Sequence, residues 1–146
     1  MPLVLCAGRR PQRNMYIVTL VTLLVSDLGG GVFSTVHIAL TAAVTGVLAG
    51  ALALALLRGS SAAWESLAIG ALAAVAVFLW RKSANMPQLN DDGLQGFSAN
   101  DWLAPVVTFT MISLYRSVRP AGGEPRFDQA RAAATLAAFV VNVVTI

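Results

Sequence analysis

The chain alternates between long apolar stretches and short stretches that are polar or rich in glycine and proline. The apolar stretches cover, approximately, residues 15–33, 33–57, 62–80, 101–116 and 127–146. A helix needs about 20 predominantly apolar residues to cross a bilayer, within a range of about 17 to 25. The second and third stretches satisfy this length, the first and fourth are marginal, and the fifth satisfies it if the chain ends at the membrane surface. The pattern predicts an all-α protein, a polytopic transmembrane helical bundle with about five spans.

The composition also favours lipid over water as the surroundings of this chain. Of its 146 residues, 57% are hydrophobic and 12% are charged, whereas soluble globular domains carry about 25% charged residues. The net charge is +3, but the basic residues cluster at the edges of the apolar stretches. This distribution is typical of charges that orient a membrane protein, and it argues against nucleic acid as a partner.

The distribution of Lys and Arg predicts how many stretches cross the membrane. If all five cross, one side receives eight basic residues and the other receives two, Arg81 and Lys82. If the first does not cross, the same residues divide five to five, which gives no orientation signal. We therefore expect five spans, a basic cytoplasmic N-terminal segment at 1–14, a single transmembrane domain at 15–146, and an outer loop at 81–100. This places the protein in a cell membrane as a multi-pass protein, with the bacterial inner membrane as the expected location.

The first stretch has two competing interpretations. Arginines followed by apolar residues 15–25 are typical of a signal peptide, although the small residues expected at a cleavage site are missing. The glycines at 29–31 would also allow a re-entrant hairpin, which protein would have to cover because its backbone groups must be hydrogen-bonded. Either alternative reduces the predicted number of spans to four.

Aromatic residues at the ends of two stretches are expected to mark the membrane interfaces, where such rings are enriched. They are Trp64, Trp80, Trp102 and Tyr115. At the start of the fourth stretch, Asp101 or Asn100 is expected to cap the helix.

Small residues recur at helical spacing and predict faces on which helices pack. Membrane helices associate through close backbone contact, which small side chains permit. The predicted packing residues are Ala39, Ala43, Gly46, Gly50 and Ala53 in the second stretch and Ser66, Gly70 and Ala74 in the third. Chance recurrence in a chain rich in Ala and Gly is the alternative explanation.

His37 is the single histidine, and it lies inside an apolar stretch. If the first two stretches form a hairpin, Asp27, Ser34 and Thr35 converge with His37 near the outer end. Such a cluster could handle a proton or an ion, because His titrates near neutral pH. The alternative is a structural histidine, bonded to a hydroxyl or carbonyl group of an adjacent helix. Asn142 is the main polar residue near the middle of a stretch.

Other chemistry is weakly indicated. Asp128 and Arg131 are three residues apart and are expected to pair. Three arginines around residues 116–126 are expected to contact lipid headgroups, namely Arg116, Arg119 and Arg126. No nucleotide-binding, hydrolase or metal-site motif occurs, and the single Cys6 cannot form an intramolecular disulfide. We therefore predict no catalytic residue, no metal site and no cofactor.

Three classes of function remain open. The first is a non-catalytic subunit or assembly partner of a larger bacterial membrane complex, packing against the bilayer and against other subunits or copies of itself. The second is a small homo-oligomeric transporter or channel that uses Asp27 and His37. The third is a holin-like pore former, suggested by small size and by the Ala and Gly content.

Overall fold

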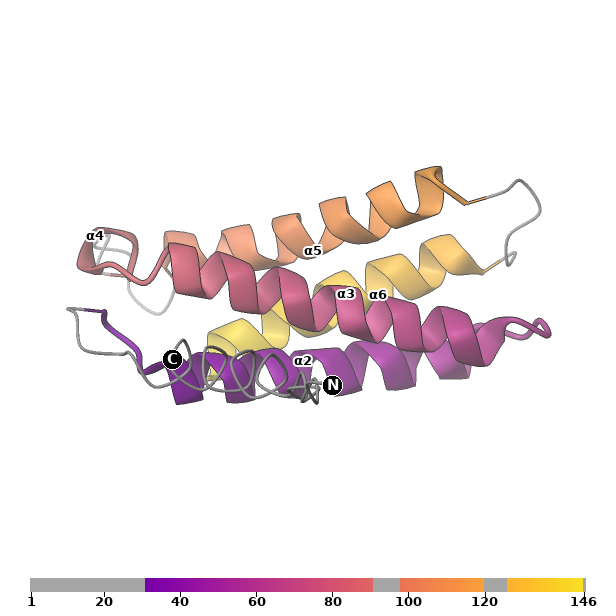
Figure 1. Ribbon diagram of the computed structural model, residues 1–146, viewed down its shortest axis with the longest axis horizontal. Helices are drawn as coiled ribbons and strands as arrows, with labels where there is room; N and C mark the ends of the chain where they lie inside the picture. Colours follow the sequence, from indigo (N-terminus) through magenta and orange to yellow (C-terminus); the bar gives the residue numbers. More distant parts are fainter. Residues whose placement is uncertain (1–30, 91–97, 120–125, 146) are drawn as a thin grey trace, which may run out of the picture.

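The computed structural model describes residues 31–90, 98–119 and 126–145 (Figure 1). All regular secondary structure in these ranges is helical, which confirms the all-α prediction. The helices are α2 (Thr35–Leu56), α3 (Ala62–Ser83), α4 (Pro87–Asn90), α5 (Ala99–Ser117) and α6 (Phe127–Val144). Two of them, α2 and α3, are long and apolar enough to cross a membrane. The predicted first span lies almost entirely outside the described residues, and α5 and α6 are not among the helices that meet this criterion. The number of five spans therefore stays a prediction.

The four long helices lie side by side, and successive ones run in opposite directions (Figure 1). Helix α2 packs on α3 and α6, and α5 packs on the same two helices. One end of the bundle therefore gathers the starts of α2 and α5 with the ends of α3 and α6. We name it the Arg81 end and the opposite one the Glu65 end, after a buried charged residue near each.

Helix α5 begins earlier than the sequence pattern indicated, at Ala99 instead of residue 101. The residue at the N-cap is Ser98, so the prediction that Asp101 or Asn100 caps the helix was wrong. Asp101 sits three residues into the motif, where its Oδ2 accepts hydrogen bonds from the Ser98 backbone N–H and hydroxyl, both at 2.9 Å. This carboxylate satisfies groups that an uncapped helix start leaves unpaired.

Small side chains fill much of the interior between the long helices. Ala49 and Ala53 of α2 pack with Ile69 and Ala73 of α3, and α6 adds Ala130 and Ala134 to the same cluster. Alanine at these positions lets the helix backbones approach closely.

The outward faces of the long helices are apolar over most of their length. Large hydrophobic side chains are exposed on each of them, including Val47 at 72%, Leu67 at 66%, Val106 at 55% and Leu136 at 64%. Helix α2 contains no Asp, Glu, Lys or Arg at all.

Candidate functional site

The closest contact between helices in the predicted packing stripe joins α2 and α3 through glycines. A Cβ atom added to Gly70 would lie 2.7 Å from the Gly46 carbonyl oxygen, and one added to Gly46 would lie 2.8 Å from the Ala74 Cβ. Gly50 faces the same contact, where an added Cβ would lie 3.3 Å from the Ser66 carbonyl oxygen. The two backbones therefore touch at Gly46 and Gly70, where no larger residue fits without a shift.

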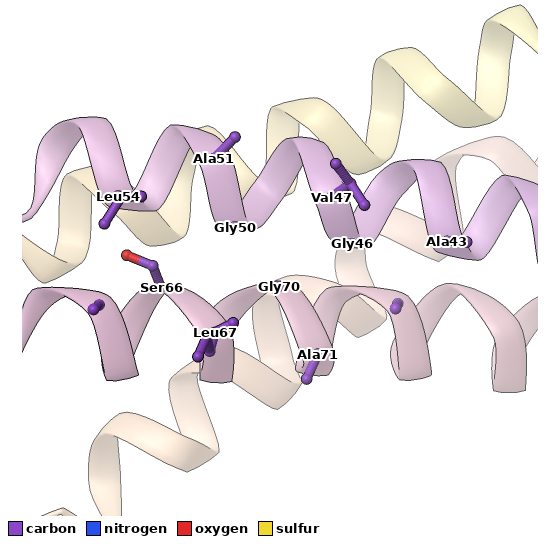
Figure 2. Close-up of a pocket in the computed structure, with 12 residues that line it drawn as sticks. Ala43, Gly46, Val47, Gly50, Ala51, Leu54, Ser66, Leu67, Gly70 and Ala71 are labelled. Carbon is purple, nitrogen blue, oxygen red and sulfur yellow. The ribbon is translucent and has the colours of Figure 1, made fainter.

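This close contact leaves a groove along the outside of the α2–α3 pair, which we name the α2–α3 groove (Figure 2). Its volume is about 700 Å³. The residues that line it are Ala43, Gly46, Val47, Gly50, Ala51, Leu54, Ala63, Ser66, Leu67, Gly70, Ala71 and Ala74. Of the predicted packing residues, Ala43, Gly46, Gly50, Ser66, Gly70 and Ala74 line this groove, Ala53 lies in the core and Ala39 is half-buried.

The groove is suited only to apolar occupants. Ser66 carries its one side-chain hydroxyl, and this group donates to the Ala62 carbonyl oxygen at 2.6 Å. The remaining lining side chains are hydrocarbon or absent. The groove can therefore take the side chains of a further apolar helix or a hydrocarbon chain, but it offers no charge for a polar substrate.

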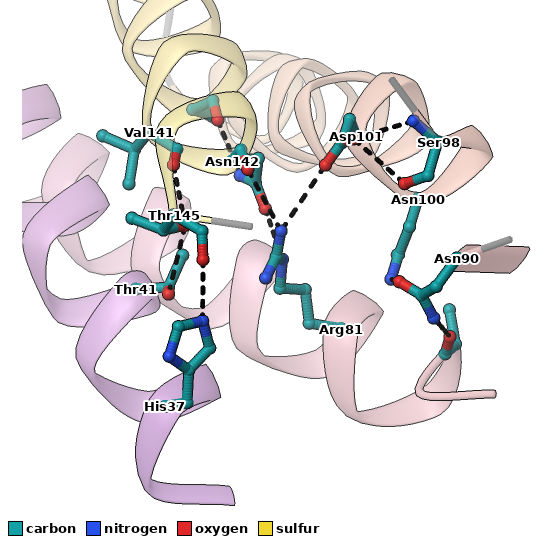
Figure 3. A network of polar contacts seen from close by, with 12 residues as sticks. His37, Thr41, Arg81, Asn90, Ser98, Asn100, Asp101, Val141, Asn142 and Thr145 are labelled. Carbon is teal, nitrogen blue, oxygen red and sulfur yellow. Dashed lines mark hydrogen bonds and ion pairs between the residues drawn. The ribbon is translucent and has the colours of Figure 1, made fainter. Parts of the chain in front are cut away.

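A second candidate site is the buried charged centre at the Arg81 end (Figure 3). Arg81 of α3 donates from Nε to Asn142 Oδ1 at 2.6 Å and from Nη2 to the Asn142 carbonyl oxygen at 3.3 Å. The same Nη2 lies 3.5 Å from Asp101 Oδ1. All three side chains are at most 1% exposed. This centre joins α3, α5 and α6 through one buried cation.

His37 lies close to this centre and bonds to a different helix. Its Nε2 is 2.9 Å from the Thr145 carbonyl oxygen at the end of α6, as the structural interpretation of this histidine predicts. Its ring stacks on Phe33 with 5.3 Å between the ring centroids. The Arg81 Cζ lies 5.4 Å from the centroid of the same phenylalanine ring. Phe33 is thus shared by His37 and the buried arginine.

The chain just before α2 is fixed to the end of α3 by Asn85. The Asn85 side chain accepts from the Phe33 N–H at 2.9 Å and donates to the Phe33 carbonyl oxygen at 2.7 Å. Both backbone groups of Phe33 are therefore held by one side chain 52 residues away.

The other members of the predicted His37 cluster make helix contacts. The Ser34 hydroxyl accepts from the His37 N–H at 3.2 Å and caps α2. Thr35 accepts a hydrogen bond from Lys82 Nζ at 2.6 Å. Asp27 lies outside the described residues, so its convergence with His37 stays a prediction.

The Glu65 end contains a second buried charge. Glu65 of α3 is fully buried, forms an ion pair with Arg119 and accepts from the Tyr115 hydroxyl at 3.3 Å. Near this end Arg131 pairs with Asp128 at 3.2 Å, as the spacing predicted. Arg131 also donates to the Ser113 hydroxyl of α5 at 3.2 Å. The charged residues at this end mostly connect one helix to another.

The predicted headgroup arginines lie at the Glu65 end, in three different environments. Arg119 forms an ion pair with Glu65. The Arg116 side chain lies over the Phe127 ring, with 5.0 Å between Cζ and the ring centroid. Arg126, just before α6, is exposed. Of the predicted interface aromatics, Trp64 and Tyr115 lie near this end, and Trp80 and Trp102 lie near the Arg81 end. Trp64 and Trp102 are exposed, whereas Trp80 and Tyr115 are half-buried.

Sequence reasoning did not predict the buried centre at the Arg81 end. It counted Arg81 as a loop charge and Asp101 as a helix cap, because each has a sufficient local explanation. Asn142 was the available signal, since an amide inside an apolar stretch needs a polar partner.

Comparison with known proteins adds no relative. No protein-family model, curated protein or solved structure matches the chain. Within the residues that the structure describes, no group of three or more His, Cys, Asp or Glu side chains could hold a metal ion.

Proposed function

We propose that this chain is a non-catalytic, multi-pass subunit or assembly partner of a larger complex in a bacterial inner membrane. The supporting observation is the arrangement of the long helices. Their outward faces are apolar, while the buried charged side chains and Asn142 bond to residues of other helices or helix ends. A bundle built in this way fits lipid and apolar protein surfaces on its outside. Its buried charged groups hold its own helices together.

The buried polar groups support a structural role for the bundle. Arg81 contacts α5 and α6, Glu65 contacts the end of α5, and His37 contacts the end of α6. Pairing of this kind offsets the high cost of placing ionisable groups in an apolar environment. It leaves the outward apolar side chains as the surface for contact with a partner.

Helix α6 presents a regular outward row that suits such a contact. Leu136, Val140 and Val144 are spaced four residues apart, so they lie on one helix face. They are 64%, 56% and 75% exposed. A neighbouring helix can pack along this row without disturbing the buried centre on the opposite side of α6.

Tryptophan scanning of outward positions tests this function. Val140→Trp on the α6 row, with Val106→Trp on α5 as the matched control, is purified in mild detergent from the native membrane. The indole is tolerated where a side chain faces lipid and breaks a contact where it faces protein. We expect Val140→Trp to abolish co-purification of a membrane partner and Val106→Trp to retain it, while both variants still insert and fold. Retention of the partner by Val140→Trp would contradict the proposed contact along α6, and a wild-type protein that purifies alone as a monomer would contradict the proposed function.

A homo-oligomeric transporter or channel is the second candidate. It is favoured by the gathering of His37, Arg81 and Asp101 at one end of the bundle, contributed by three different helices. Under this alternative, His37→Gln in reconstituted vesicles reduces ion or proton flux. Under the subunit proposal, the wild-type protein shows no flux to lose.

A further inference from the structure

Helix α2 forms one side of the α2–α3 groove. It is the first helix of the described part of the chain, so residues 1–30 directly precede it. Asn85 holds Phe33 at the Arg81 end, and α2 starts two residues later. We propose that the chain's own apolar stretch at residues 15–25 packs lengthwise against α2 and α3 as an additional helix and occupies the half of this groove nearer the Arg81 end.

The length of the preceding chain matches the position of the groove. With a rise of about 1.5 Å per residue, Ala43 lies about 12 Å and Gly50 about 22 Å along α2 from Thr35. If the chain turns at the glycines 29–31, a helix over residues 15–28 reaches back about 21 Å. It therefore extends beside α2 to about the level of Gly50, alongside the nearer half of the groove.

The side chains of the stretch complement the groove in size. Residues 15–25 read MYIVTLVTLLV, with large apolar side chains at most positions and no glycine or alanine. The floor of the groove is formed by Gly46, Gly50 and Gly70, and its edges carry Val47 and Leu67. Small residues on one helix surface leave room for the large side chains of another, which allows close packing of helices in lipid.

The charges that precede the stretch agree with this placement. Arg9, Arg10 and Arg13 would extend toward the Glu65 end. The arginines Arg58, Arg116 and Arg126 already lie at that end. Packing in the groove thus gathers the basic residues on one side of the membrane, which is the distribution that fixes orientation.

The covalent connection favours this occupant over a separate molecule. A segment joined by a few residues experiences an effective concentration in the millimolar range for its neighbouring surface. A second copy of the chain or a lipid chain must compete with it. These two occupants are distinguishable outcomes of the experiment below.

Cysteine cross-linking tests the proposal in native membrane vesicles. In a Cys6→Ser background, Val47→Cys is combined in turn with Val18→Cys, Thr19→Cys, Leu20→Cys and Val21→Cys. The matched control combines the same four changes with Leu136→Cys, which is comparably exposed but lies on α6. After mild oxidation, thiols are counted with a polyethylene-glycol maleimide on a denaturing gel. An intramolecular disulfide consumes both thiols without forming a dimer.

We expect intramolecular disulfides with Val47→Cys at positions that follow helical spacing, and none with Leu136→Cys. Disulfide-linked dimers through Val47→Cys would overturn the proposal in favour of a second copy. Free thiols in all Val47→Cys pairs would also overturn it and leave the groove to lipid or another protein. A mature chain that begins after residue 25 would overturn it too, because the segment would have been removed. None of these outcomes depends on whether a partner subunit exists.

Discussion

At the scale of single residues, the Arg81 centre is the most demanding feature of this protein. A buried guanidinium group needs both charge compensation and hydrogen-bond acceptors. Asp101 supplies the opposite charge, and Asp101 and Asn142 together accept from Nε and Nη2 of Arg81. Removing one partner of a buried ion pair costs about 3–5 kcal/mol, because the remaining charge stays uncompensated. Pairs exposed to water contribute about 0–1 kcal/mol.

Asp101→Asn is therefore expected to lower the free energy of unfolding by about 3–5 kcal/mol. Asparagine keeps an oxygen that can accept from Ser98, so the loss is chiefly that of the charge. The control Asp128→Asn, at a pair whose carboxylate is 72% exposed, should change stability by less than about 1 kcal/mol. Thermal unfolding in detergent measures both. The double variant Arg81→Met with Asp101→Asn should recover part of the loss. Equal effects of Asp101→Asn and Asp128→Asn on stability would refute this role for the buried pair.

The glycine contact gives a graded prediction. Gly70→Ala places a methyl group 2.7 Å from the Gly46 carbonyl oxygen, so the helices must move apart. We expect a loss of about 1–3 kcal/mol, typical of overpacking. Gly50→Ala meets its nearest atom at 3.3 Å, and the better helix propensity of alanine, about 1 kcal/mol, offsets the smaller strain. Unfolding measurements that rank Gly50→Ala as the more damaging variant would contradict the described contact.

Local pairs could be predicted from the sequence at this scale, whereas distant pairs could not. Asp128 and Arg131 are three residues apart on one helix, and their spacing alone brings them together. Arg81 and Asp101 meet across a loop, in a register that no local rule specifies. The hydrogen bond from His37 to Thr145 joins residues 108 positions apart. A hydroxyl or carbonyl partner in another helix could be predicted for His37, but the residue that supplies it could not.

At the scale of elements, the helix ends depend on polar side chains that hydropathy alone misreads. The apolar pattern ended the third stretch at residue 80, but α3 continues to Ser83. Arg81 turns inward to an ion pair, so its charge does not end the helix. The fourth stretch was predicted to begin at residue 101, but Ser98 and Asp101 form a capping arrangement that starts α5 at Ala99.

The start of α2 should depend on Asn85 for its attachment to the bundle. Asn85→Ala removes both hydrogen bonds to the Phe33 backbone. We expect amide hydrogen exchange at Phe33 to become about tenfold faster, the equivalent of about 1.4 kcal/mol of lost protection. The His37 amide, which Ser34 holds within the same helix start, serves as the internal control. Exchange that is unchanged at Phe33, or equally faster at both amides, would argue against a specific attachment.

At the scale of the whole molecule, the two ends of the bundle differ in charge. Arg58, Arg116, Arg119, Arg126 and Arg131 belong to the Glu65 end. At the Arg81 end, Arg81 is buried and neutralised by Asp101. Among the described residues, Glu65 and Asp128 offset two of these five arginines, and Lys82 adds one positive charge at the Arg81 end. The Glu65 end therefore keeps the larger positive charge. This difference supports our proposal that the Glu65 end lies on the cytoplasmic side.

This orientation predicts the accessibility of introduced thiols. In a Cys6→Ser background, Ser60→Cys at the Glu65 end should react with a membrane-impermeant maleimide only after the inner membrane is opened. Ser83→Cys at the Arg81 end should react without opening it. Both positions are exposed in the structure, so accessibility to the reagent reports on the side of the membrane. Reaction of Ser60→Cys in sealed cells would show that the Glu65 end faces outward and would contradict the predicted orientation.

The most direct test of the central claim is the native mass of the protein after extraction from its own membrane in mild detergent. A membrane subunit should be released only by detergent and should be measured in a complex with at least one larger membrane protein at fixed stoichiometry. A protein that leaves the membrane without detergent, or that is recovered only as a monomer, would contradict the account.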